Sequence, residues 1–155
     1  DRQAQLSQAK KQIESANSEY TDAQNTYNSL KKQLDALKEQ NISMAIVSNK
    51  ADDAVKDLAK YYFAKYIDVA IGEREGISRK PAPDSVYEAM RLLGATKENT
   101  VYVGDSDVDR ATAKNAGIPC ISVTWGFRSE ELLVSLEPEY LIHKPEEILS
   151  VVTGK

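Results

Sequence analysis

Apolar residues recur at alternating steps of three and four along the first 37 residues of the chain. They are Leu6, Ala9, Ile13, Ala16, Tyr20, Ala23, Tyr27, Leu30, Leu34 and Leu37. This is the a/d spacing of a heptad repeat. No glycine or proline interrupts it, because all of these residues lie after residue 70. The pattern predicts one helix over residues 1–40, about 60 Å long, followed by a second segment over residues 41–155.

The apolar seam of this helix needs a cover, because a lone helix leaves such a stripe in water. We expect Leu30, Leu34 and Leu37 to pack on the domain that follows. For residues 1–26 we favour a partner helix, in the same chain or in another one. A helix partner or self-association through residues 1–37 is therefore expected.

Short apolar runs alternate with helical patterns in the second segment. The predicted strands are 42–48, 66–71, 100–103, 119–123 and 140–142, and the predicted helices are 52–62, 83–93, 108–115, 129–136 and 146–152. Such alternation is typical of an α/β fold with a doubly wound parallel sheet and helices on both faces. Ligands of such sheets bind beyond the carboxyl ends of the strands.

Composition narrows the classes of function. Hydrophobic residues make up 41% of the 155 residues and charged residues 28%, which excludes a wholly disordered chain. The net charge of −4, without a basic stripe, disfavours a nucleic-acid binder. No apolar run approaches the roughly 20 residues that span a bilayer. Cys120 is the only cysteine, which excludes an intrachain disulfide and favours a reducing, cytoplasmic setting.

Polar side chains collect where the predicted strands end. Ser48 and Asn49 follow the first strand, Asp105 and Asp109 follow the third, and Lys80 precedes the helix over 83–93. A hydroxyl, an ammonium and carboxylates at one edge suit the binding of a phosphate together with Mg²⁺. Each residue also has an ordinary interpretation, since aspartates cap helices and a lone lysine or serine is commonly a surface residue.

Several stretches resemble the haloacid dehalogenase superfamily, and phosphoglycolate phosphatases most of all. Ala45–Lys50 is similar to the second motif of that family, a strand that ends in a phosphate-binding Ser or Thr. Lys80, within Arg79–Asp84, matches the lysine of the third motif, and Val101–Asp109 matches the acidic fourth motif. The likeness extends through Ala116–Pro119 and Val123–Arg128, the stretches that follow the fourth motif.

The resemblance implies a Mg²⁺-dependent phosphomonoester hydrolase that acts on a small phosphorylated metabolite. Ser48 would donate a hydrogen bond to the phosphoryl group, and Lys80 would neutralise its oxygens. Asp105 would bind Mg²⁺, and Asp109 would orient the metal site. Asn49 would also face the substrate. The resemblance does not identify the substrate, because cap residues usually select it.

The first motif of the family, a strand that ends in Asp-x-Asp-x-Thr, has no counterpart in this sequence. Its first aspartate is the nucleophile of the family. Residues 107–111 contain an Asp-x-Asp but carry Ala where the family has Thr or Val. In the family the missing strand lies between those that end at Ser48 and at Val103. These two strands are therefore expected either to pair directly or to leave a gap.

Three explanations remain open for the missing motif. The chain is a fragment of a full phosphatase, a coiled-coil arm fused to an inert domain, or a protein whose missing strand comes from another chain. The alternative function is therefore a non-catalytic coiled-coil interaction protein. Enzymatic activity of the chain itself stays open at this point.

Overall fold

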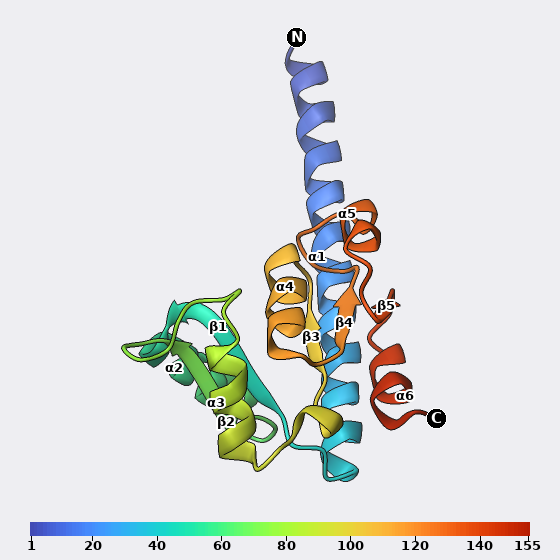
Figure 1. Ribbon diagram of the computed structural model, residues 1–155. Coiled ribbons are helices and arrows are strands. Elements are labelled where there is room, and N and C mark those ends of the chain that lie inside the picture. The colour runs from blue at the N-terminus through green and yellow to red at the C-terminus, as the bar shows by residue number, and fades with distance from the viewer.

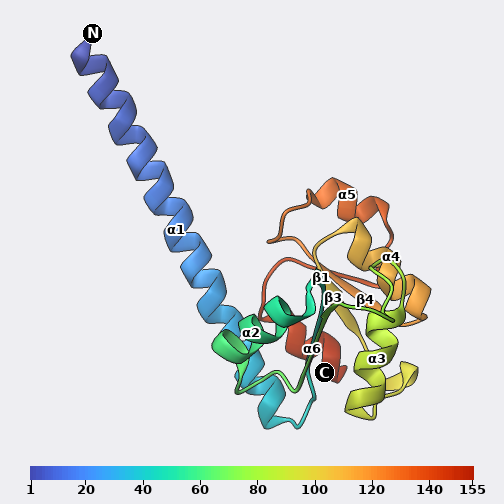
Figure 2. The ribbon, with the colours of Figure 1, turned by 90° about the vertical axis from the view of Figure 1, so that its left-hand side faces the viewer.

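The computed structural model describes residues 1–155 and shows a long helix that projects from an α/β body (Figures 1 and 2). The helices are α1 (Arg2–Glu39), α2 (Asp52–Phe63), α3 (Asp84–Leu93), α4 (Asp107–Ala116), α5 (Glu130–Ser135) and α6 (Glu147–Thr153), with a 3₁₀ turn η1 (Lys97–Asn99). The strands are β1 (Ala45–Ala51), β2 (Val69–Glu73), β3 (Tyr102–Gly104), β4 (Cys120–Val123) and β5 (Tyr140–Ile142). The predicted alternation of helices and strands is confirmed.

The strands are parallel, as predicted, but they form two sheets. β1 pairs with β2, and β3, β4 and β5 form a second sheet in that order. Nothing pairs with the edge of β1 that lies away from β2, or with the edge of β3 that lies away from β4. The strands predicted to end at Ser48 and Val103 were expected either to pair directly or to leave a gap, and in the structure they leave a gap.

The first predicted strand began too early, because its apolar start belongs to the end of α1. Asn41 has a left-handed φ of 57°, and the N–H of Ile42 donates to the carbonyl of Leu37 at 3.0 Å. This is the Schellman arrangement, which closes a helix and brings an apolar residue back onto its last turn. Ile42 packs against the same core cluster as Leu37. The strand therefore covers 45–51 rather than 42–48.

The second predicted strand was also too early, for a similar reason. The N–H groups of Tyr66 and Ile67 both donate to the carbonyl of Phe63, at 2.8 and 2.9 Å, and so complete the end of α2. The ladder starts at Val69, opposite Ala45 of β1.

Two apolar clusters cover opposite faces of the sheets. Val86 and Met90 of α3 join Ala113 of α4 and Tyr102 of β3 in one cluster, and Val47 of β1 packs against it. The other cluster contains Leu37, Ile121, Val123, Ile142 and Ile148, and Leu30 packs against it. The last turns of α1 therefore pack on the α/β body, as predicted for Leu30 and Leu37.

The first two thirds of α1 make no such contact. Leu6, Ile13 and Tyr20 of the heptad seam are 63%, 61% and 69% exposed, and both views show this part of the helix away from the body (Figures 1 and 2). A partner for residues 1–26 stays a prediction. None of the helices combines the length and the apolar character that crossing a membrane requires.

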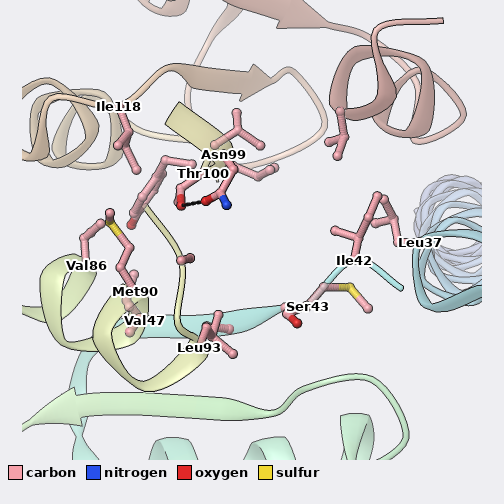
Figure 3. A pocket seen from close by; sticks show the side chains of 18 of the residues that line it. Leu37, Ile42, Ser43, Val47, Val86, Met90, Leu93, Asn99, Thr100 and Ile118 are labelled. Atoms are coloured by element: carbon pink, nitrogen blue, oxygen red, sulfur yellow. Dashed lines mark hydrogen bonds between the residues drawn. The ribbon is translucent and has the colours of Figure 1, made fainter. Parts of the chain in front are cut away.

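A cavity of about 610 Å³ lies between β1 and β3 (Figure 3). Its walls include Val47 from β1, Val86 and Met90 from α3, and Leu37 and Ile42 from the end of α1. The space is partly open to solvent.

Candidate active site

The end of β1 leaves the sheet and contacts the loop that carries Lys80. Pairing with β2 is regular through Val47 and resumes only at Ala51, opposite Glu73. Within this interruption, the side-chain amide of Asn49 accepts from the backbone N–H of Lys80 at 2.8 Å and donates to its carbonyl at 3.1 Å. Asn49 therefore fixes the backbone of Lys80 at the carboxyl end of β1.

The ammonium of Lys80 reaches across to β3 and α4. Its Nζ donates to Oδ1 of Asp109 at 2.7 Å and to the hydroxyl of Tyr102 at 3.1 Å. The side chains of Lys80 and Asp109 are only 14% and 12% exposed. Partly buried ions of this kind interact more strongly than pairs in open water. The contact joins the two sheets at their carboxyl edge.

The carboxylate of Asp109 accepts four hydrogen bonds. Besides Lys80, its donors are the hydroxyl of Tyr102 at 3.0 Å, the hydroxyl of Ser106 at 2.7 Å and the N–H of Asp105 at 3.2 Å. Burial by itself raises the pKa of Asp109, but the hydrogen bonds from Lys80, Ser106 and Tyr102 outweigh it and lower the pKa. Asp109 is therefore held as an anion that orients Lys80.

Two glycines make room for the acidic residues. A Cβ on Gly104 would lie 2.3 Å from Cβ of Asp109, and a Cβ on Gly126 would lie 2.0 Å from Oδ2 of Asp105. The N–H of Phe127 donates to this same Oδ2 at 3.0 Å. The backbone of the loop after β4 therefore holds the carboxylate of Asp105 in place. Gly104 is required here for close packing, since its φ is not in the left-handed region.

The structure shows where each predicted site residue lies. Asn49, Lys80, Asp105 and Asp109 are joined by the hydrogen bonds above. Ser48 precedes Asn49 in the interrupted part of β1, and its hydroxyl accepts from the N–H of Lys50 at 3.1 Å. The roles assigned to these residues by the resemblance, including substrate contact by Asn49, stay predictions.

Sequence reasoning missed two residues of this network. Tyr102 contacts both Lys80 and Asp109. The available signal in the sequence was its position two residues before Gly104, in a short predicted strand. Ser106 caps α4, because its hydroxyl accepts from the N–H of Asp109 at 3.2 Å. Neither aspartate is the N-cap, which removes the ordinary interpretation of Asp105 and Asp109 as caps.

The donor set limits how a cation would be held. No three His, Cys, Asp or Glu side chains gather closely enough to enclose a metal ion. Both oxygens of Asp109 already accept from protein groups, whereas for Asp105 the only such donor is the N–H of Phe127, to Oδ2. Mg²⁺ usually keeps several waters and uses one or two carboxylates together with substrate phosphate. The residues therefore fit a hydrated Mg²⁺ with Asp105 as its protein ligand.

The side chains that serve elsewhere as nucleophiles or bases are poorly placed here. Cys120 is fully buried, and burial raises the pKa of its thiol to about 11. His143 is exposed, and its Nε2 lies 2.7 Å from a carboxylate oxygen of Glu130 on α5. The residues described here can bind and polarise a phosphoryl group but include no evident attacking group.

The family model described as haloacid dehalogenase-like hydrolase matches residues 1–123. The chain therefore belongs to this family, as the motifs predicted. A Caldanaerobacter subterraneus protein provisionally named pyrophosphatase PpaX is 34% identical over 126 residues, which are 81% of this chain and 57% of that protein. The phosphoglycolate phosphatase of Photorhabdus laumondii is 29% identical over 120 residues, 77% of this chain and 51% of that protein.

Solved structures share the fold. A Lactobacillus delbrueckii protein provisionally named phosphoglycolate phosphatase superposes with a TM-score of 0.77 at 35% sequence identity. The match covers 80% of this chain and 52% of that one. The chain thus spans little more than half the length of the relatives it matches.

Proposed function

We propose that these residues form the phosphate- and Mg²⁺-holding part of a phosphatase that acts on a small phosphorylated metabolite. The observation that carries the proposal is the position of Lys80, whose backbone is fixed by Asn49 and whose ammonium is fixed by Asp109 and Tyr102. A fixed ammonium at the carboxyl ends of parallel strands is placed to stabilise a phosphoryl group. Asp105 lies at the same edge, one residue beyond β3.

The proposed roles follow from these contacts. Lys80 neutralises phosphoryl oxygens, and Ser48 donates a hydrogen bond to one of them. Asp109 keeps the ammonium oriented. Asp105 holds Mg²⁺, which spreads positive charge over the phosphoryl oxygens when it is bound. The named relatives make 2-phosphoglycolate and inorganic pyrophosphate the two compounds to compare, and the motifs favour 2-phosphoglycolate.

We expect the 155-residue chain to bind phosphate without hydrolysing phosphate esters. Covalent phosphoryl transfer needs an activated nucleophile, and none of the residues at this edge supplies one. With Mg²⁺, turnover of p-nitrophenyl phosphate should stay at the background rate. Turnover that Asp105→Asn abolishes would show that a nucleophile is present after all.

Binding tests the proposal more directly than turnover. Calorimetric titration with 2-phosphoglycolate, in the presence of Mg²⁺, should give a saturable heat that Lys80→Met removes. The control is Lys60→Met, which deletes an exposed lysine on α2. Equal binding by wild type and Lys80→Met, or equal loss in both variants, contradicts the proposal.

The exposed heptad seam of α1 favours a second candidate function, that of an interaction module. In water, Leu6, Ile13 and Tyr20 leave an apolar stripe uncovered. If another helix covers the stripe, light scattering should show a mass that rises with concentration and falls to the monomer when residues 1–26 are removed. An unchanged mass after truncation counts against self-association through this segment.

A further inference from the structure

We propose that residues 6–23 of α1 bind the same residues of a second copy of this chain, with the two helices antiparallel and related by a twofold axis between Ile13 and Ala16. Naming a second copy as the partner of the heptad seam rests on the second candidate function above, and the direction and register of the pair go beyond it. A twofold interface uses the same surface patch on both copies, so this patch must be complementary to itself.

The seam residues are complementary in size to their own reversed order. Over three successive heptads the a positions carry large side chains and the d positions carry alanine: Leu6, Ile13 and Tyr20 at a, and Ala9, Ala16 and Ala23 at d. Reversing one helix sets its d positions against the a positions of the other, so every large side chain meets an alanine. The pairs in this register are Leu6 with Ala23, Ile13 with Ala16, and Tyr20 with Ala9.

A parallel pair would pack the same seam less well. It would set a against a and d against d, so that layers of two large side chains alternate with layers of two alanines. The large layers would hold the helices apart and leave voids at the alanine layers, whose atoms would lose packing contacts. With one large and one small residue in every layer, the antiparallel pair fills all layers at one spacing, toward the short end of the roughly 8–10 Å that separates packed helices.

The charges of the segment favour the same direction. Residues 1–14 carry three basic and two acidic side chains, whereas residues 15–28 carry two acidic side chains, Glu19 and Asp22, and no basic one. The antiparallel register lays the net positive stretch of each copy along the net negative stretch of the other. A parallel pair would place Glu19 and Asp22 at the level of their own copies, where like charges disfavour association.

The free length of the seam matches the length of the second helix. The a positions are exposed from Leu6 to Tyr27, whereas Leu30 already packs on the α/β body. In the proposed register, residue 1 of the second copy lies level with residue 28, directly before this contact. Figure 2 shows the free part of α1 extending beyond the body. The second helix would therefore continue the cover of the seam from the point where the body ends.

Disulfide cross-linking of the full 155-residue chain tests the direction and the register. The native Cys120 is fully buried, so an added cysteine on α1 is the accessible thiol. In the antiparallel pair, residue 6 of one copy meets residue 23 of the other, while the two copies of residue 6 lie 17 residues apart, about 26 Å along the axis. A disulfide cannot form when the Cα atoms are more than about 7 Å apart.

The cross-linking experiment mixes two single variants, Leu6→Cys and Ala23→Cys, under mild oxidation. We expect intact-mass spectrometry to find a cross-linked species that contains one chain of each variant. Each variant by itself should stay free of cross-links, because in the antiparallel pair its two cysteines lie too far apart.

Two matched lysine variants test whether the seam is the contact surface. Ile13→Lys places a charge beside the twofold axis, whereas Ser18→Lys places one at an f position, on the outer face of the helix. Both side chains are exposed and lie outside the α/β body. In light scattering at rising concentration, Ile13→Lys should weaken self-association by at least about tenfold, and Ser18→Lys should leave it unchanged.

Several results would overturn the proposal. They are a monomer at every concentration, equal self-association of both lysine variants, and no mixed cross-link although the mass rises with concentration. If each cysteine variant instead cross-links with itself, the helices are parallel, so the antiparallel pair fails while the interaction function stands. None of these results bears on the phosphate site, which the titration with 2-phosphoglycolate tests separately.

Discussion

The ion pair between Lys80 and Asp109 is expected to couple the two sheets energetically. Both side chains are nearly buried, and their atoms are 2.7 Å apart. Lys80→Met would leave the carboxylate of Asp109 without its cation, which for a buried pair costs about 3 to 5 kcal/mol. Asp109 keeps three other donors, so we expect the lower end, about 3 kcal/mol.

A double-mutant cycle isolates the pair. The double variant Lys80→Met/Asp109→Asn should lose less free energy of unfolding than the two single variants lose together. We expect the difference, which is the coupling energy of the pair, to be about 2 kcal/mol. The assay is urea unfolding at pH 7, followed by the fluorescence of Trp125, the only tryptophan. Trp125 packs against the core cluster that contains Ile121 and Val123, so its emission should report loss of the fold.

The matched control is the pair formed by Arg128 and Asp107, which is also short, at 2.9 Å, but about half exposed. Water screens such pairs, and their coupling is typically below about 1 kcal/mol. If the cycle for Lys80 and Asp109 gives no more coupling than the cycle for Arg128→Met and Asp107→Asn, Lys80 is not held as we argue.

Three further predictions concern the same region and the lone histidine. The pKa of Asp109 in the folded protein lies below the ordinary 3.8. The ionised carboxylate therefore contributes its full stabilisation of the fold above pH 3.8, and this contribution is lost as the pH falls through the folded pKa. In urea unfolding, Asp109→Asn should lack this pH-dependent part of the free energy of unfolding. Gly126→Ala should displace Asp105, weaken calorimetric binding of 2-phosphoglycolate with Mg²⁺ and lower the stability by about 1 to 3 kcal/mol, whereas unchanged binding would show that the close approach is unimportant. The hydrogen bond that the ring N–H of His143 donates to the carboxylate of Glu130 raises the pKa of His143 above 6.5, so an NMR titration should find this pKa raised in wild type and nearer 6.5 in Glu130→Gln.

The helix ends were the most predictable part of the fold, because single residues determine them. Gly94 and Gly117 close α3 and α4 with φ of 64° and 73°, a conformation that glycine adopts without strain. The strand starts were less predictable. Ile42 is as apolar as a strand residue, yet the left-handed Asn41 commits it to the cap of α1.

The chemistry-bearing residues could be named from the sequence, but their connections could not. Asn49 and Lys80 are 31 residues apart, and their contact is made through the backbone of Lys80, which no side-chain pattern encodes. Nothing in the sequence indicates that the hydroxyl of Tyr102 lies between Lys80 and Asp109. The sequence left open whether β1 and β3 pair directly or leave a gap. Strand patterns predict where strands lie along the chain, but they do not predict which strands become neighbours in a sheet.

We propose that Ser48, Asn49, Lys80 and Asp105 surround one phosphoryl group. Amide chemical-shift mapping by NMR, with inorganic phosphate added in the presence of Mg²⁺, tests it most directly. We predict that the resonances of these four residues shift together along one saturation curve, while those of Lys60 and the rest of α2 stay in place. Shifts confined to other parts of the chain, or none at all at saturating phosphate, would contradict the account.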